Sequence, residues 1–195
     1  MIYFYHVRPT KARRGRPLML APIDLEDQTG FVSLYGYDNL TKAKIQKVGH
    51  LRDLHQEKLF ANEIVIDFDD SPVEARTFWE KCNDEGWAAC LFLIGGWHSA
   101  HVLLYHDDVF ELDLNLRHKE WAKQNAPGCD LSIYKPSGII RCEGNQHETR
   151  VGEFKTYTAA WAGASIELPP IPKKTLSKRQ YEARDDVDEE EAALD

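Results

Sequence analysis

Long apolar segments are absent from this sequence. No hydrophobic run approaches the roughly 20 residues that a membrane-spanning helix needs. The opening residues, MIYFYHVRPT, lack the pattern of a secretory signal peptide. We therefore expect neither secretion nor membrane insertion, and we expect a cytoplasmic protein without a membrane partner.

Closely spaced cysteines are also absent. The four cysteines stand far apart in the sequence and no two form a C-x-x-C pair: Cys82, Cys90, Cys129 and Cys142. Structural zinc sites depend on such short spacings. The sequence therefore predicts no zinc and no disulfide framework, and it favours buried, reduced thiols.

Charge is concentrated near the ends of the chain. Of the 32 acids, seven fall in residues 185–195, which contain no base, so the other 25 nearly balance the 24 bases. An early basic segment contains Arg13, Arg14 and Arg16, and residues 173–184 hold five bases and one acid. Basic patches suit polyanions such as nucleic acid, although surface charge also serves solubility.

The hydrophobic pattern predicts one α+β domain in a chain of 195 residues, of which 43% are hydrophobic. The clearest signals are a strand at 63–69, a helix that Ser71 caps and Pro72 begins, and two strands around the Gly95-Gly96 turn. Weaker patterns favour strands at 1–8, 110–114, 131–134, 139–142 and 152–157, and helices at 40–58, with a break at Gly49, and 116–125. We expect a largely antiparallel sheet with helices on one side over residues 1–167, followed by a flexible linker and acidic tail over 168–195.

Two short motifs have the residue types of a phosphate-handling site. Asp67 and Asp69 alternate with Phe68 on a predicted strand, so both carboxylates face one side, where a cation such as magnesium or manganese would relieve their repulsion. Ser99 and His101 have the same spacing after a glycine turn, which suits a phosphate. A third carboxylate would complete a two-metal site, and periodicity leaves Asp113 and Asp130 as alternatives.

Together these motifs resemble the catalytic domain of archaeo-eukaryotic-type primases, in particular the small primase-polymerases of phages and plasmids. The resemblance spans about residues 60–155, with IVIDFD, GGWHSAH and Cys129-Asp130 in the places of the three family motifs. A downstream run also matches, with Arg141, Gly144, Asn145 and His147. This register selects Asp130 over Asp113. The chain departs from the family at Gly95, where many relatives carry Ser, and it lacks the zinc-binding insertion of many relatives.

The resemblance implies an RRM-like palm and template-directed synthesis or extension of primers on single-stranded DNA from nucleoside triphosphates. Asp67, Asp69 and Asp130 would bind two Mg²⁺ or Mn²⁺ ions. Four residues would contact the nucleotide: Ser99, His101, Arg141 and His147. The basic segment of Arg13, Arg14 and Arg16 would contact the template backbone. A helicase or single-strand-binding protein is a further expected partner, in the cytoplasm of a host cell.

Two other functions fit the same residues. A metal-dependent nuclease or phosphodiesterase would use the same acids on a phosphodiester. A catalytically weak accessory protein would only bind single strands, although five intact motif residues argue against a degenerate site. A primer-extension assay separates these functions, because a polymerase lengthens a labelled primer and a nuclease shortens it.

Overall fold

Two long antiparallel strands form the centre of the protein in a computed structural model, which describes residues 2–7, 20–22, 30–49, 51, 54–147 and 150–170. Strands β5 (Lys58–Asp69) and β7 (Ser99–Leu112) pair from Lys58↔Leu112 to Asp69↔Ser99. Their register shifts once, between Ala61 and Glu63. Asp67 and Asp69, which alternate with apolar residues as the sequence predicts, therefore lie within the paired region of β5 and β7.

Three more strands complete the main sheet, whose order is β4-β5-β7-β6-β9 and whose pairs are all antiparallel. These are β4 (Gly36–Tyr37), β6 (Ala89–Ile94) and β9 (Lys155–Trp161). The α+β class with a mostly antiparallel sheet is confirmed in these ranges. The strand predicted after the Gly95-Gly96 turn and the strand predicted at 110–114 are one continuous strand, β7.

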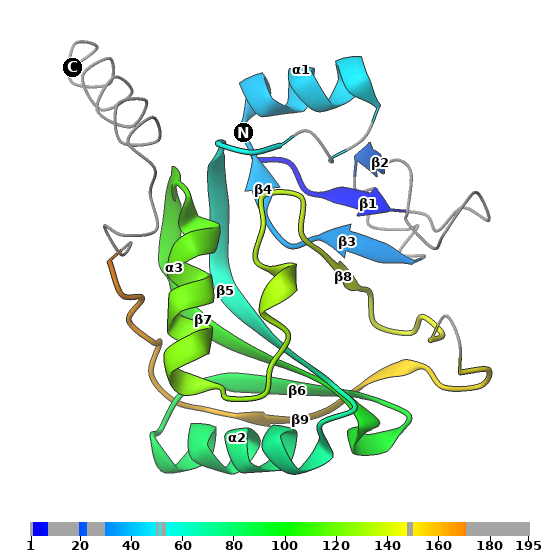
Figure 1. Cartoon of the computed structure of the whole chain (residues 1–195), viewed down its shortest axis with the longest axis vertical. Coiled ribbons are helices and arrows are strands. Elements are labelled where there is room, and N and C mark those ends of the chain that lie inside the picture. The colour runs from blue at the N-terminus through cyan, green and yellow to red at the C-terminus, as the bar shows by residue number, and fades with distance from the viewer. Residues whose placement is uncertain are drawn as a thin grey trace.

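Helices α2 (Pro72–Asp84) and α3 (Leu114–Asn125) cover one face of this sheet (Figure 1). Phe68 of β5 meets Phe78 of α2 with ring centroids 5.6 Å apart, and Phe78 in turn meets Trp121 of α3 at 6.4 Å. Burying each such side chain contributes about 1.5–3 kcal/mol. The helical face holds the apolar core, which leaves the Asp67 side of β5 for polar groups.

The helix ends agree with the sequence only in part. Helix α1 (Asn39–Val48) begins after Asp38, whose carboxylate accepts from Thr41 N at 2.7 Å, and it ends at Gly49, where φ is 74°. Pro72 begins α2 as predicted, but Ser71 makes no capping bond. Its hydroxyl donates instead to the carbonyl of Asp69 at 3.1 Å. That bond fixes the turn directly after the D-x-D motif.

A second, smaller sheet lies beside the first and was not predicted as a unit. Its antiparallel order is β2-β1-β3-β8, made of β1 (Tyr5–Val7), β2 (Leu20–Pro22), β3 (Phe31–Ser33) and β8 (Ile139–Arg141). The predicted strand at 131–134 is wrong, because Leu131–Ile133 form a 3₁₀ helix. Asp130 accepts from Ser132 N at 2.7 Å and so turns the chain at that point.

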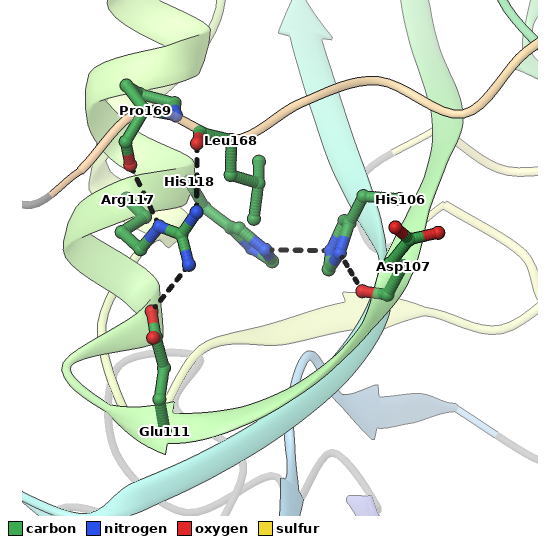
Figure 2. A network of polar contacts seen from close by, with 7 residues as sticks. All are labelled: His106, Asp107, Glu111, Arg117, His118, Leu168 and Pro169. Carbon is green, nitrogen blue, oxygen red and sulfur yellow. Dashed lines mark hydrogen bonds and ion pairs between the residues drawn. The ribbon is translucent and has the colours of Figure 1, made fainter.

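His118 of helix α3 contacts His106 of strand β7 (Figure 2). His118 Nε2 lies 3.1 Å from His106 Nε2, while His106 Nδ1 donates to the carbonyl of Asp107 at 2.7 Å and Tyr35 Oη lies 3.2 Å from His118 Nδ1. In the neutral form of His106, a hydrogen on Nδ1 leaves Nε2 as an acceptor to which His118 Nε2 can donate. Burial lowers the pKa of both imidazoles, which favours this neutral arrangement.

After β9 the chain returns along the sheet as far as Pro170. Ile166 N donates to the carbonyl of Tyr105 at 2.8 Å. Arg117 of α3 donates to the carbonyls of Leu168 and Pro169, each at 2.8 Å, and to Glu111 at 3.1 Å (Figure 2). Leu168 and Pro169, placed in the linker by sequence, are thus bound to α3. No helix among the described residues is both long and apolar enough to cross a membrane.

Candidate active site at the end of two central strands

The two predicted motifs face each other across the central ladder. Asp67 is the direct partner of His101, and Asp69 is the direct partner of Ser99. Ser99 Oγ donates to Asp69 Oδ1 at 3.2 Å, and His101 Nε2 lies 3.3 Å from Asp67 Oδ1. Directly opposed side chains share one face of a sheet. Each acid of the first motif therefore has its own polar partner in the second.

The carboxyl of Asp69 has a pKa raised by its surroundings. Burial raises the pKa of its carboxyl, and the nearby negative charges of Asp67 and Asp130 raise it further. The hydrogen bond from Ser99 and the nearness of His101 act in the opposite direction. Repulsion among three carboxylates is the condition that a bound cation relieves.

Asp130 belongs to the same region because the segment before the 3₁₀ helix lies along the free edge of β5. Its backbone N donates to the carbonyl of Asp67 at 2.8 Å, and the hydroxyl of Tyr134 donates to the carbonyl of Val65 at 2.6 Å. The Asp130 carboxylate accepts from both the backbone N and the hydroxyl of Ser132, at 2.7 and 2.9 Å. Asp130 is thus adjacent to the motif acids but is turned toward Ser132.

Asp113, the other candidate for the third carboxylate, lies elsewhere. It follows the last residue of β7, whereas Ser99 and His101 lie at the first end. The eleven strand residues 102–112 separate it from His101, which corresponds to about 40 Å of extended chain. It adopts φ 59° at the start of α3, where its side chain is buried. Among the described residues, Asp130 thus lies next to the motif acids, whereas Asp113 lies at the opposite end of β7.

His101 is held as a neutral, buried imidazole. Burial lowers its pKa, and the nearby Asp67 carboxylate opposes that effect only in part. In the neutral form, a hydrogen on Nε2 suits the contact with Asp67, which leaves Nδ1 as an acceptor. Nδ1 is buried and has no hydrogen-bond partner among the described residues. This acceptor nitrogen is enclosed by protein, so a ligand would reach it only if the surrounding side chains move.

The glycine turn is tied to the end of β5. Gly95 and Gly96 have φ values of 63° and 74°, and Asp70 N donates to the carbonyl of His98 at 2.7 Å. A Cβ atom on Gly95 would lie 2.0 Å from a carboxylate oxygen of Glu153. The positive φ and this close approach favour glycine at position 95.

The remaining predicted residues are distributed around this centre. Arg141 is nearly buried on β8, donates to the carbonyl of Gln146 at 2.6 Å and lies over the Phe31 ring at 4.8 Å. His147 lies in the connection between β8 and β9, where its backbone N donates to the carbonyl of Glu153 at 2.7 Å. Arg13, Arg14 and Arg16 lie outside the described residues, as does the acidic tail.

Lys155 is a component of the site that sequence reasoning missed. It begins β9, is only 5% exposed, and donates to the carbonyl of Arg141 at 2.7 Å. Burial lowers the pKa of its amine to about 8, against the raising effects of Cys142, Asp67 and Glu63. In the sequence, Lys155 shares one face of the predicted strand at 152–157 with Tyr157, but that spacing does not indicate burial. This amine adds a positive charge behind the acidic motif.

The site contains oxygen atoms that could bind a divalent cation, but they do not form a complete set of ligands among the described residues. Within the described ranges, no three His, Cys, Asp or Glu side chains are grouped closely enough to hold a metal ion. The carboxylates of Asp67, Asp69 and Asp130 nevertheless supply the hard oxygen ligands that Mg²⁺ and Mn²⁺ prefer. The Asp130 carboxylate is bonded to Ser132, so it would have to exchange that contact for a shared ion. The feature of the site that fits a cation is the pKa of Asp69, which burial and the nearby charges of Asp67 and Asp130 raise.

Comparison of the chain with protein-family models, with curated proteins and with solved structures finds no match in any of the three.

Proposed function

We propose that this protein is a nucleotidyltransferase that synthesises or extends primers on single-stranded DNA from nucleoside triphosphates. The observation that carries the proposal is the direct pairing of the two motifs, Asp67 with His101 and Asp69 with Ser99. Asp130 joins them through the backbone bond to Asp67. The motif resemblance to primase-polymerases supports the same reaction, and the α+β architecture is compatible with it.

In this proposal Asp67, Asp69 and Asp130 hold two divalent cations, Mg²⁺ or Mn²⁺. When bound, these ions neutralise charge on the triphosphate and favour ionisation of the attacking 3′-hydroxyl. The protein positions the groups around them. Ser99 orients Asp69 through its hydroxyl, and His101 orients Asp67 through its Nε2. Positioning and charge stabilisation provide most of the catalysis in phosphoryl transfer.

A labelled primer on a longer template, incubated with nucleoside triphosphates and Mg²⁺ or Mn²⁺, tests this function. Wild-type protein should lengthen the primer, and chelation should stop it. Asp67→Asn and Asp130→Asn should each reduce the rate by at least about a hundredfold, because each removes an anionic ligand. Asp113→Asn is the matched control and should extend the primer at a rate within a few fold of wild type. Loss of extension in Asp113→Asn with a normal melting temperature, and normal extension in Asp130→Asn, would reverse the assignment.

A nuclease or phosphodiesterase is the second candidate, and the Asp67–His101 contact favours it. A carboxylate that orients a neutral histidine is also part of the arrangement of a general base, in which the second ring nitrogen would activate water once solvent reached it. The same assay distinguishes the two functions, because hydrolysis shortens the primer without nucleoside triphosphates. A primer that is shortened by wild-type protein and preserved by His101→Ala would support the hydrolase.

A further inference from the structure

Two aromatic residues continue the row of the candidate site across the sheet. Asp67 is paired with His101, His101 with Phe92, and Phe92 with Tyr157. Directly paired residues place their side chains on the same face. Asp67, His101, Phe92 and Tyr157 therefore form one line over strands β5, β7, β6 and β9, on the face opposite the helices.

The side chain of Tyr157 is exposed to solvent and packs on one side against Phe92. Tyr157 is 49% exposed on the edge strand β9. Its ring meets the partly buried ring of Phe92 at 5.7 Å and 72°, an edge-to-face contact, and the amine of Lys155 lies 4.8 Å from the centre of the Phe92 ring. Single exposed aromatics are common on protein surfaces. This one differs because it is supported by Phe92 and aligned with the polar motifs.

The spacing of the row matches the length of one nucleotide. Neighbouring strands are about 4.8 Å apart, so the backbones at His101 and Tyr157, two strands apart, are about 10 Å from each other. A nucleotide whose phosphates lie near His101 and the glycine turn can therefore place its base at Tyr157. Stacking on an aromatic ring needs no charge and accepts every base, because each base has a π-face.

We propose that Tyr157, supported by Phe92, forms the base-stacking subsite for the nucleotide whose phosphates lie beside Ser99 and His101. This inference rests on the proposed nucleotidyltransferase function and names the part of the molecule that binds the base. It also gives β9, the edge strand of the main sheet, a role in substrate binding. The subsite should show little preference among bases, since ring stacking carries no hydrogen-bond pattern.

The test compares wild type with Tyr157→Ala, Tyr157→Phe and Phe110→Ala by isothermal titration with ATP and Mg²⁺. Phe110 is 42% exposed at the far part of β7 and is the matched control for losing an exposed ring. Tyr157→Ala should weaken ATP binding by about five- to a hundredfold, the usual effect of removing one stacked ring. Tyr157→Phe, which keeps the ring, and Phe110→Ala should bind within about twofold of wild type. Tripolyphosphate, which has no base, should bind wild type and Tyr157→Ala equally.

Each other outcome has a distinct meaning. Equal ATP affinity in wild type and Tyr157→Ala overturns the subsite and leaves the proposed function in place. Wild-type protein that neither binds ATP nor extends a primer overturns the function itself, and the subsite with it. Titration with a short oligothymidylate forms a second arm. If Tyr157→Ala weakens that binding and not ATP binding, the ring stacks on the template strand and the assignment to the nucleotide is wrong.

Discussion

The buried pair His106 and His118 should make the protein sensitive to mild acid. Burial lowers the pKa of both imidazoles, most strongly that of His118, and the positive charge of Arg117 lowers both further. The two Nε2 atoms lie 3.1 Å apart, a distance that needs one of them without a hydrogen. The groups that face the pair are Arg117, which is itself paired with Glu111, the carbonyl and charge of Asp107, the backbone of Glu63 and the hydroxyl of Tyr35.

The sign of the effect follows from proton binding. In the folded chain each ring binds its proton at a lower pH than in the unfolded chain, where each binds a proton near pH 6.5. The unfolded state therefore binds more protons, and the free energy of unfolding decreases as the pH falls from about 6.5 toward the lower folded-state pKa values. A histidine that remained neutral to pH 5 would cost about 2 kcal/mol there, and two would cost about 4 kcal/mol. That is a large fraction of the roughly 5–15 kcal/mol by which domains are stable.

The perturbation is His118→Gln, which removes one titrating group and keeps a polar side chain. Its stability at pH 8 should be about 1–3 kcal/mol below wild type, because a glutamine cannot reach both Tyr35 and His106. Between pH 8 and pH 5, however, it should lose about 2 kcal/mol less than wild type. The informative quantity is thus the slope with pH and not the stability at one pH.

Urea denaturation followed by tryptophan fluorescence, at half-unit steps from pH 8 to pH 5, measures that slope. His55→Gln, a change at an exposed histidine, is the matched control and should reproduce the wild-type pH dependence. Parallel curves for wild type and His118→Gln would refute the reasoning, since they would mean that His118 binds its proton equally in both states.

Three further predictions concern the contacts that hold the site and the charge of the tail. Tyr134→Phe should lower the free energy of unfolding by about 1–3 kcal/mol in urea denaturation, because the buried carbonyl of Val65 loses its donor; an unchanged value would mean that this bond adds nothing. Arg117→Lys should speed proteolytic cleavage near Leu168, since a lysine cannot reproduce the guanidinium fork; equal digestion rates would contradict it. Deleting residues 185–195 should strengthen binding to single-stranded DNA at low salt, with the difference vanishing near 1 M salt, where the Debye length is about 3 Å; equal affinities at low salt would remove self-competition as the role of the tail.

Local patterns were sufficient for the elements that carry the two motifs. The strand at 63–69 has β-branched residues, the helix has Pro72 at its start, and period-two alternation puts Asp67 and Asp69 on one face. The register between the motifs was beyond that kind of reasoning. Strand β7 follows β6 in the chain but inserts between β5 and β6 in the sheet. That order depends on which apolar faces pack on α2 and α3.

The second sheet could be predicted only in part. The predicted strands at 1–8 and 139–142 contain β1 and β8, but β2 and β3 are only three residues each, too short for a period to be measured. The segment 131–134 fails for a different reason. Its alternation favours a strand, but the Asp130 carboxylate takes the backbone N of Ser132 and turns the chain into a 3₁₀ helix. A side-chain to backbone bond of this kind outweighs a four-residue pattern.

Lys155 illustrates why the charge balance of the site is a tertiary property. A lysine in a short edge strand ordinarily points to solvent, and nothing in its own segment indicates otherwise. It is buried because β9 pairs with β6, which places its amine beside Phe92 and near Asp67 and Glu63, carboxylates that belong to β5. Without that amine the acids of β5 would face each other with less compensation, and their repulsion would oppose folding of the very ladder that aligns the motifs. The Lys155 cation therefore stabilises the ladder, while burial and the nearby charges of Asp67 and Asp130 still raise the pKa of Asp69, and that repulsion is what a divalent cation would relieve.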